Sequence, residues 1–167
     1  MLKMLLSCFA LCLTILATPV YAEASPNDAA ALENVSVGKA IFDINIAGDN
    51  PQKLALYLQV IQETVTGLVE QNVKPDILLA FRGSAVKLIT TEQSEDLALD
   101  VEEQLEQVAA LLKDLADNGV KIEACSVATR LFGVSNDTLL PNIKPVGNTF
   151  ISLIGYQAKG YAVIPIY

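Results

Sequence analysis

The chain has 167 residues, enough for about one domain with its own hydrophobic core. Its net charge is −8, from 19 acidic and 11 basic side chains, and the sequence contains no basic patch. Because an acidic surface repels phosphate groups, this composition argues against nucleic acid and anionic lipid as partners. Apolar residues make up 52% of the chain, so we expect a globular domain rather than a disordered one.

Two scarcities in the composition restrict the possible chemistry. The sequence has no histidine, which excludes Ser-His-Asp triads, Cys-His dyads and zinc sites built on imidazole. Of the three cysteines, Cys8 and Cys12 lie in an N-terminal segment that we expect to be removed, so Cys125 is left alone. A single cysteine forms neither an intrachain disulfide nor a Cys-x-x-Cys redox pair. The acidic side chains show no metal-ligand spacing with Cys125, so we predict neither a metal nor a cofactor.

Residues 1–22 have the layout of a secretory signal peptide. Lys3 supplies the positive start, an apolar stretch follows, and Pro19 interrupts it. Val20 and Ala22 occupy the small-residue positions that a signal peptidase reads. We therefore expect cleavage after Ala22 and a periplasmic product with no membrane attachment. An uncleaved membrane anchor is the alternative interpretation.

The segment after the predicted cleavage point leads into a single domain. Residues 23–37 are small and polar, and we expect them to form a flexible lead-in to a domain over 38–167. At 39–47 apolar and polar side chains alternate, which predicts a strand. Asn50 and Pro51 are typical first residues of a helix, and the apolar residues that follow at spacings of three and four predict that it runs to about residue 72.

The remaining predicted elements alternate between strand and helix. They are a strand at 73–81, a turn at 82–90 that adds a short strand or helical turn, a helix capped by Ser94 and ended by Gly119, a strand at 120–125, a short helix at 126–132 closed by Gly133, a strand at 142–146, a helix begun by Asn148, and a strand at 161–167. Pro165 restricts the last strand to an edge of the sheet or places it at the strand's own end. Strands that alternate with helices predict an α/β fold, an open and mostly parallel sheet with helices on both faces, layered as in flavodoxin-like proteins.

Ligands of open α/β sheets bind beyond the carboxyl ends of the strands. Four stretches are predicted to meet at that rim: 47–50, 81–84, 125–129 and 146–148. Cys125 ends its strand and directly precedes a helix, where backbone N–H groups favour the thiolate, the reactive form. We therefore take Cys125 as the candidate catalytic residue.

Five further residues of the rim form the candidate ligand-binding set: Arg82, Gly83, Ser126, Thr129 and Arg130. The two arginines are the groups that would add positive charge near the thiol. Purely structural roles remain open for Cys125 and Arg82. Cys125 is also consistent with a small buried hydrophobe, and Arg82 with a surface ion-pair partner.

Several stretches together resemble the DsrE/DsrF-like family, in particular its exported single-domain members. They are "KAIFDIN", "DILLAFRGSAVKLI", "NGVKIEACSVATRLFGV" and "LLPNIKPVGNTFISLIGYQAKGYAVI", and they span about residues 38–167. The more specific signals are the Gly-Val-x-x-x-x-Cys strand, the later Gly133 and the closing Leu-x-x-x-Gln-x-x-Gly-Tyr.

This resemblance implies a compact α/β sandwich that associates into trimers or hexamers. In sulfur-oxidising relatives a cysteine accepts sulfur as a persulfide and passes it on, and Cys125 matches that cysteine in position. Many relatives have His-Gly where this chain has Arg82-Gly83, so a role for that imidazole is lost here.

Two functions follow from these observations. The first is an exported, oligomeric module that binds a small molecule or a protein partner at the strand-end rim without catalysis. The alternative is a thiol relay in which Cys125 carries persulfide sulfur between a donor and an acceptor protein, which needs an ionised thiol but no separate base. If the chain is an enzyme, the reaction that we expect is sulfur transfer through Cys125.

Overall fold

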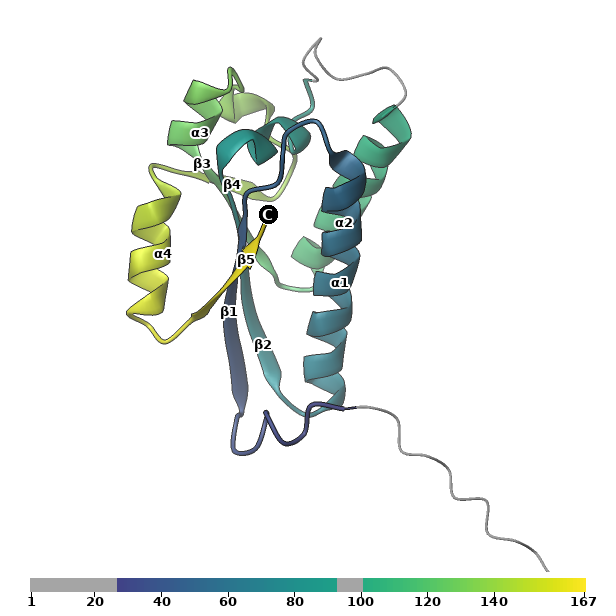
Figure 1. Cartoon of the computed structure of the whole chain (residues 1–167), viewed down its shortest axis with the longest axis vertical. Helices are drawn as coiled ribbons and strands as arrows, with labels where there is room; N and C mark the ends of the chain where they lie inside the picture. Colours follow the sequence, from purple (N-terminus) through teal and green to yellow (C-terminus); the bar gives the residue numbers. More distant parts are fainter. Residues whose placement is uncertain (1–26, 93–100) are drawn as a thin grey trace, which may run out of the picture.

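The computed structural model describes residues 27–92 and 101–167; the predicted signal peptide, Cys8, Cys12 and Ser94 lie outside these ranges. Within them the chain forms a five-stranded sheet in the order β4-β3-β2-β1-β5, and every neighbouring pair is parallel. The strands are β1 Val37–Ile44, β2 Lys74–Phe81, β3 Lys121–Cys125, β4 Ile143–Val146 and β5 Ala162–Ile166. The predicted open, parallel α/β sheet is confirmed (Figure 1).

The helices lie where the apolar spacing predicts them. They are α1 Pro51–Glu70, the 3₁₀ helix η1 Gly83–Leu88, α2 Glu102–Asp117, α3 Ser126–Leu131, the 3₁₀ helix η3 Asn136–Thr138 and α4 Thr149–Gln157. The start of α1 follows the capping rule, because the Asn50 side chain accepts the N–H of Lys53 at 2.9 Å. Gly119 and Gly133 adopt the left-handed conformation after α2 and α3, as a helix end favours.

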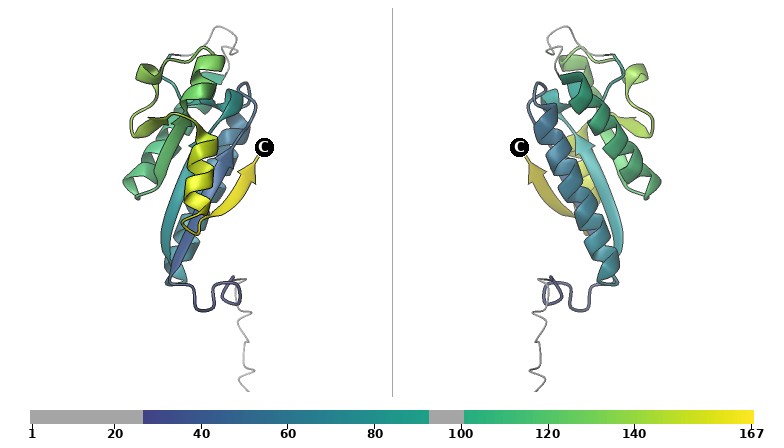
Figure 2. Two further views of the ribbon diagram at one scale, coloured as in Figure 1. Left: turned by 90° about the vertical axis from the view of Figure 1, so that its left-hand side faces the viewer. Right: turned by 90° about the vertical axis from the view of Figure 1, so that its right-hand side faces the viewer.

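The sheet is covered by helices on both faces. α1 and α2 lie on one face and α4 lies on the other (Figure 1), and the two side views of Figure 2 each show one of these layers in front of the sheet. The strand order explains this arrangement. Steps from β1 to β2 and from β2 to β3 proceed in one direction, whereas the step from β4 to β5 returns past them. Right-handed crossovers in opposite directions place their helices on opposite faces.

The two layers bury very different amounts of apolar side chain. The larger core cluster joins the sheet to α1 and α2, and includes Leu58, Leu79, Phe81 and Val108. The cluster under α4 has four buried members: Ile41, Leu78, Ala80 and Tyr161. The core that stabilises the fold therefore lies mainly on one side of the sheet.

The two ends of the described chain also bear on the predictions. Residues 29–34 form turns, and the backbone N–H of Asp28 donates to the side chain of Gln71 at 3.0 Å. β5 is an edge strand, so Pro165 needs no ladder partner on its outer side, as predicted. In the part of the chain that the structure describes, no helix is both long and apolar enough to cross a bilayer.

Candidate functional site

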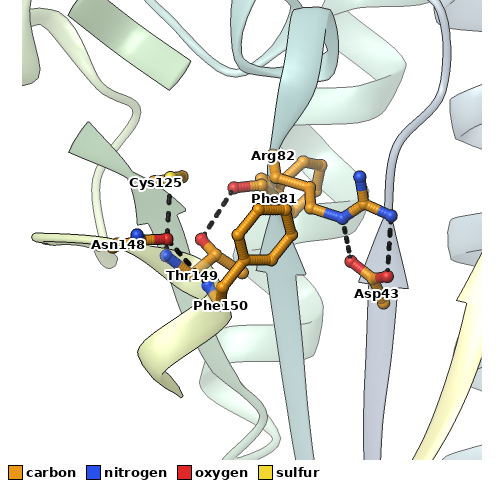
Figure 3. A network of polar contacts seen from close by, with 7 residues as sticks. All are labelled: Asp43, Phe81, Arg82, Cys125, Asn148, Thr149 and Phe150. Carbon is orange, nitrogen blue, oxygen red and sulfur yellow. Dashed lines mark hydrogen bonds and ion pairs between the residues drawn. The ribbon is translucent and has the colours of Figure 1, made fainter. Parts of the chain in front are cut away.

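Cys125 is the last residue of β3, and α3 begins directly after it. The first turn of α4 also lies against Cys125. The backbone N–H of Thr149 donates to its sulfur at 3.4 Å (Figure 3). That turn is held by Asn148, whose side chain accepts the N–H of Phe150 at 3.0 Å and so caps α4. Two helix N-termini thus direct N–H groups toward one thiol.

The pKa of the Cys125 thiol results from two opposing effects. Burial raises the pKa, because a thiolate is poorly solvated inside a protein. Hydrogen bonds from the N–H and hydroxyl of Thr149, and from the N–H groups of Val127 and Ala128, lower the pKa by more. The net pKa is below the ordinary value of a cysteine, so a larger share of Cys125 is the nucleophilic thiolate.

Cys125 is 6% exposed, and it lines a pocket of about 220 Å³. The pocket has a largely apolar lining: Val127, Ala128, Leu131, Phe132 and Phe150, together with Arg82, Gly83, Asn148 and Thr149. Of the lining side chains, Leu131 is the most exposed, and it stands with Phe132 and Phe150 at the open side. The thiol is therefore the reactive group of a small apolar pocket rather than of an open surface.

Arg82 lines the same pocket, but its guanidinium is bound to Asp43 of the neighbouring strand. Nε donates to Asp43 Oδ1 at 2.6 Å and a terminal nitrogen donates to Oδ2 at 2.9 Å (Figure 3). This two-point contact raises the pKa of Arg82 above its already high ordinary value. The guanidinium also stacks on Phe150, 5.7 Å from the ring centre. Arg82 is thus held in an ion pair, which is largely buried rather than the surface pair of the alternative interpretation, and its ring contact anchors the start of α4.

Thr149 links these parts of the site. Its hydroxyl lies 3.5 Å from the carbonyl of Phe81 and also near the sulfur, so its single proton is shared between these two acceptors, while its N–H reaches the sulfur. The side chain is completely buried. The contacts of Thr149 and the stacking of Phe150 on Arg82 hold the first turn of α4 against the ends of β2 and β3.

The other predicted residues fall into three groups. Gly83 lines the pocket with φ +60°, and a side chain there would collide with Asn45. Ser126 and Thr129 do not line the pocket, because both are bound by Asn136, which donates to Ser126 Oγ at 3.1 Å and accepts from Thr129 Oγ1 at 2.7 Å. Arg130 is exposed and is not part of the pocket.

Two residues of the site were not singled out from the sequence. Asp43 stands between Phe42 and Ile44 in an apolar strand, and a charge in such a position signals a buried partner. Thr149 directly follows the helix cap, one residue beyond the predicted rim stretch 146–148. Neither signal names the partner, because Arg82 follows β2 and Cys125 ends β3, far from Asp43 and Thr149 along the chain.

The described ranges contain no group of three or more carboxylate or cysteine side chains able to hold a metal ion. The arrangement instead provides one polarised thiol, N–H donors directed at it, and an apolar pocket. Its chemistry is that of a nucleophilic sulfur, without a neighbouring base among the residues that line the pocket.

The profile of the DsrE/DsrF-like family matches residues 39–166, nearly all of the described domain. The chain belongs to the DsrE/DsrF-like family. The match confirms the resemblance seen in the sequence; it does not bear on export.

Solved structures agree with this assignment at the level of the fold. A protein of unknown function from Methanobacterium thermoautotrophicum, MTH1491, is 18% identical with a TM-score of 0.60, over 77% of this chain and 99% of that one. The ychN protein from E. coli is 17% identical with a TM-score of 0.55, over 78% of this chain and 100% of that one. A search of curated protein sequences finds no match. At these identities the likeness is one of fold alone.

Proposed function

We propose that this chain is a thiol carrier that accepts sulfane sulfur on Cys125 and passes it to an acceptor. The observation that carries the proposal is the buried thiol in the lining of a pocket, with the Thr149 N–H on its sulfur and a lowered pKa. A persulfide carrier needs this much: a thiolate nucleophile and space for the donor. Membership of a family in which some members relay sulfur is consistent with it.

The transfer step is a thiol exchange at sulfur. The Cys125 thiolate attacks the outer sulfur of a donor persulfide, R–S–SH, and a new S–S bond forms as the donor S–S bond breaks. The electron pair of the broken bond leaves on the donor thiolate, which takes up a proton from the solvent. The terminal sulfur on Cys125 then undergoes the same attack by an acceptor thiolate, which regenerates the free cysteine.

The compartment and the processing of the chain are part of the proposal. Cleavage after Ala22 would release a periplasmic protein that starts at Glu23, supported by the charged start, apolar run and Val-x-Ala ending. N-terminal sequencing of the exported product tests this. A chain that begins at Met1 would contradict it.

Intact mass measurement tests the carrier function directly. The protein is incubated with an alkyl persulfide, freed of the donor, and weighed without reductant. We expect the mass of one added sulfur on the wild-type chain, its absence from Cys125→Ser, and its loss when an acceptor thiol is added. Wild-type protein that gains no sulfur while Cys125 stays open to alkylation would overturn the proposal.

A second candidate function is binding without transfer, at the same rim. The observation that favours it is the low exposure of Cys125 within a pocket whose lining is mainly apolar. An uncharged ligand of small size, or an apolar side chain of a partner protein, would fill such a pocket. Ligand binding that survives Cys125→Ser would support this function, and equal loss of binding and sulfur uptake in that variant would count against it.

We also propose that the chain associates with itself. Support comes from two exposed apolar side chains of α4, Ile151 and Ile154, which do not line the Cys125 pocket. Covering such side chains is a common reason for subunit contacts. Sedimentation at micromolar concentration should show an oligomer, with a trimer or hexamer expected, and Ile151→Lys should shift it toward monomer. A wild-type monomer would contradict this part of the proposal.

A further inference from the structure

The charges around the Cys125 pocket define which sulfur donors can enter it. Among the described residues that line the pocket, Arg82 is the only one with a charged side chain. The open side is formed by Leu131, Phe132 and Phe150, which are apolar. An anionic donor therefore finds one possible counter-ion beside the thiol.

The positive charge of that counter-ion, Arg82, is already paired with the carboxylate of Asp43. Both carboxylate oxygens of Asp43 accept hydrogen bonds from the guanidinium of Arg82, at 2.6 and 2.9 Å. The side chain of Asp43 is 8% exposed and that of Arg82 is 19% exposed. A donor carboxylate that replaced Asp43 would leave a buried carboxylate without its partner, which is costly. The pair consequently resists exchange.

We infer that Asp43, by occupying Arg82, makes Cys125 selective for uncharged sulfur donors over anionic ones. The identification of the reagent as a sulfur donor rests on the proposed function above. An anionic donor would lose its hydration in an apolar pocket and gain no free cation in return. The net charge of −8 acts in the same direction, since it repels anions at a distance.

This selectivity separates two classes of donor by chemistry. An alkyl persulfide with an uncharged carbon chain can enter in its protonated R–S–SH form and present its outer sulfur to the thiolate, with the carbon chain against the apolar lining. Thiosulfate, or a persulfide whose carrier bears carboxylates, has to bring its charge to the same lining. Asp43 touches neither the donor nor the thiol, so it is a specificity residue that acts through Arg82.

Two alkylating reagents of similar size test the charge selectivity without any sulfur donor. Iodoacetamide is neutral and iodoacetate is anionic; in both, the Cys125 sulfur forms a bond to carbon and iodide leaves. Rates are read by mass mapping of the peptide that contains Cys125, in the folded chain and in the same chain in urea. We expect the iodoacetate to iodoacetamide rate ratio to be about tenfold lower in the folded chain. Equal ratios would overturn the inference.

Variants assign the effect to Asp43. Asp43→Asn removes the main anion bound to Arg82, leaving only its weaker interaction with Tyr167, and should raise the ratio several-fold above that of the wild type. Asp49→Asn is the matched control, because it removes an equal charge from an exposed position in the loop after β1 and should leave the ratio unchanged. If Asp43→Asn does not fold, Arg82→Gln serves instead: Asp43 then stands unpaired beside the pocket, and the ratio should fall further. A ratio that stays constant in Asp43→Asn or rises in Arg82→Gln would overturn the inference.

Sulfur donors of the two classes separate this inference from the proposed function. The intact-mass assay is run with the persulfide of 2-mercaptoethanol, which is uncharged in its carbon chain, and with thiosulfate, which releases sulfite. Sulfur uptake at equal rates from both would overturn the selectivity and leave the carrier function standing. Charge selection in alkylation without uptake from either donor would overturn the carrier function and leave the selectivity standing.

Discussion

The two faces of the sheet are made by alternate residues of the same strands, yet they carry different kinds of side chain. The face under α1 and α2 is apolar throughout the strand centres, with Leu79 and Phe81 of β2 completely buried. The face under α4 carries Asp43 and Glu123 among a few apolar residues, and Cys125 meets α4 at the end of β3 while also packing against the larger cluster. Because successive side chains of a strand point to opposite sides, one face serves stability while the other is free to carry chemistry.

The polar face also leaves groups incompletely matched. Glu123 is 7% exposed; one of its oxygens accepts the Tyr156 hydroxyl at 3.2 Å, and the other is buried without a partner in the described structure. Nearby, Lys121 and the Tyr161 hydroxyl both contact Asp76. A buried oxygen without a partner, such as that of Glu123, reduces the net stability that this face contributes. α4 therefore covers a site more than it builds a core.

The largest expected difference between the faces is measured on neighbouring residues of β2. Leu78 and Leu79 are both completely buried, on the α4 face and on the α1/α2 face respectively. Leu79→Ala should lower the free energy of unfolding by about 3–5 kcal/mol, and Leu78→Ala by about 2–3, because the smaller cluster has fewer neighbours to lose and more freedom to collapse. Urea titration measures both, with the exposed Leu56→Ala as a control that should change little. Equal losses at 78 and 79 would remove the distinction.

The next effect concerns the ion pair between Arg82, which lines the pocket, and Asp43. Arg82→Met leaves the more deeply buried Asp43 carboxylate without its cation and should cost about 3 kcal/mol of unfolding free energy. Asp43→Asn leaves an amide that still accepts a hydrogen bond and an arginine that can turn to solvent, so about 1–2 kcal/mol is expected. Denaturant unfolding of the two variants decides the order. A larger loss in Asp43→Asn would mean that the pair is not held by burial of the carboxylate.

Glu123 should respond in the opposite direction. Glu123→Gln keeps an oxygen for the Tyr156 hydroxyl and removes the cost of a buried charge, so stability should rise by up to about 1 kcal/mol. Tyr156→Phe is the matched variant, because it removes the donor and should lower stability by about 1 kcal/mol. Thermal unfolding at neutral pH provides both values. Destabilisation by Glu123→Gln would show that the free oxygen has a partner in solution.

The smallest effect is the pH dependence that Cys125 adds to stability. Its pKa is lower in the folded chain than in the unfolded one, so the folded state binds fewer protons between the two values. The stabilisation is fully present above the unfolded pKa of about 8.5 and is lost as the pH falls through the folded pKa. The stability of wild type relative to Cys125→Ser should therefore rise with pH across that window. A flat or falling difference in urea titrations would contradict the lowered pKa.

Much of the fold follows from local patterns in the sequence. The strands at 39–47 and 73–81 and the helix begun by Asn50 are marked by periodicity and capping residues that lie within a few positions of each other. The edge position of β5 is one of the two alternatives that Pro165 leaves open in the sequence. The predicted helix start at Ser94 falls outside the described residues, so that boundary stays a prediction. These features depend on neighbours along the chain, which a single sequence contains.

The site was predicted in part. Cys125, Arg82 and Gly83 come together at one pocket, whereas Ser126 and Thr129 turn to Asn136 and Arg130 stays in solvent. The sequence pattern predicts only that residues following the strand ends lie at the same rim of the sheet. Which of them point into the pocket depends on rotamers and on hydrogen bonds made by neighbouring loops.

By itself, the sequence determined the alternation of strands and helices, the parallel sheet, and the place of Cys125 at the junction of β3 and α3. Only the tertiary structure decided that Arg82 binds Asp43 and that Thr149 reaches the sulfur. The physical reason is how far apart along the chain the interacting residues lie. Helix and strand periodicity is a property of adjacent residues, but the two contacts join residues 39 and 24 positions apart, and they form only when the register of β1 against β2 and the return of the chain from β4 into α4 are set by packing.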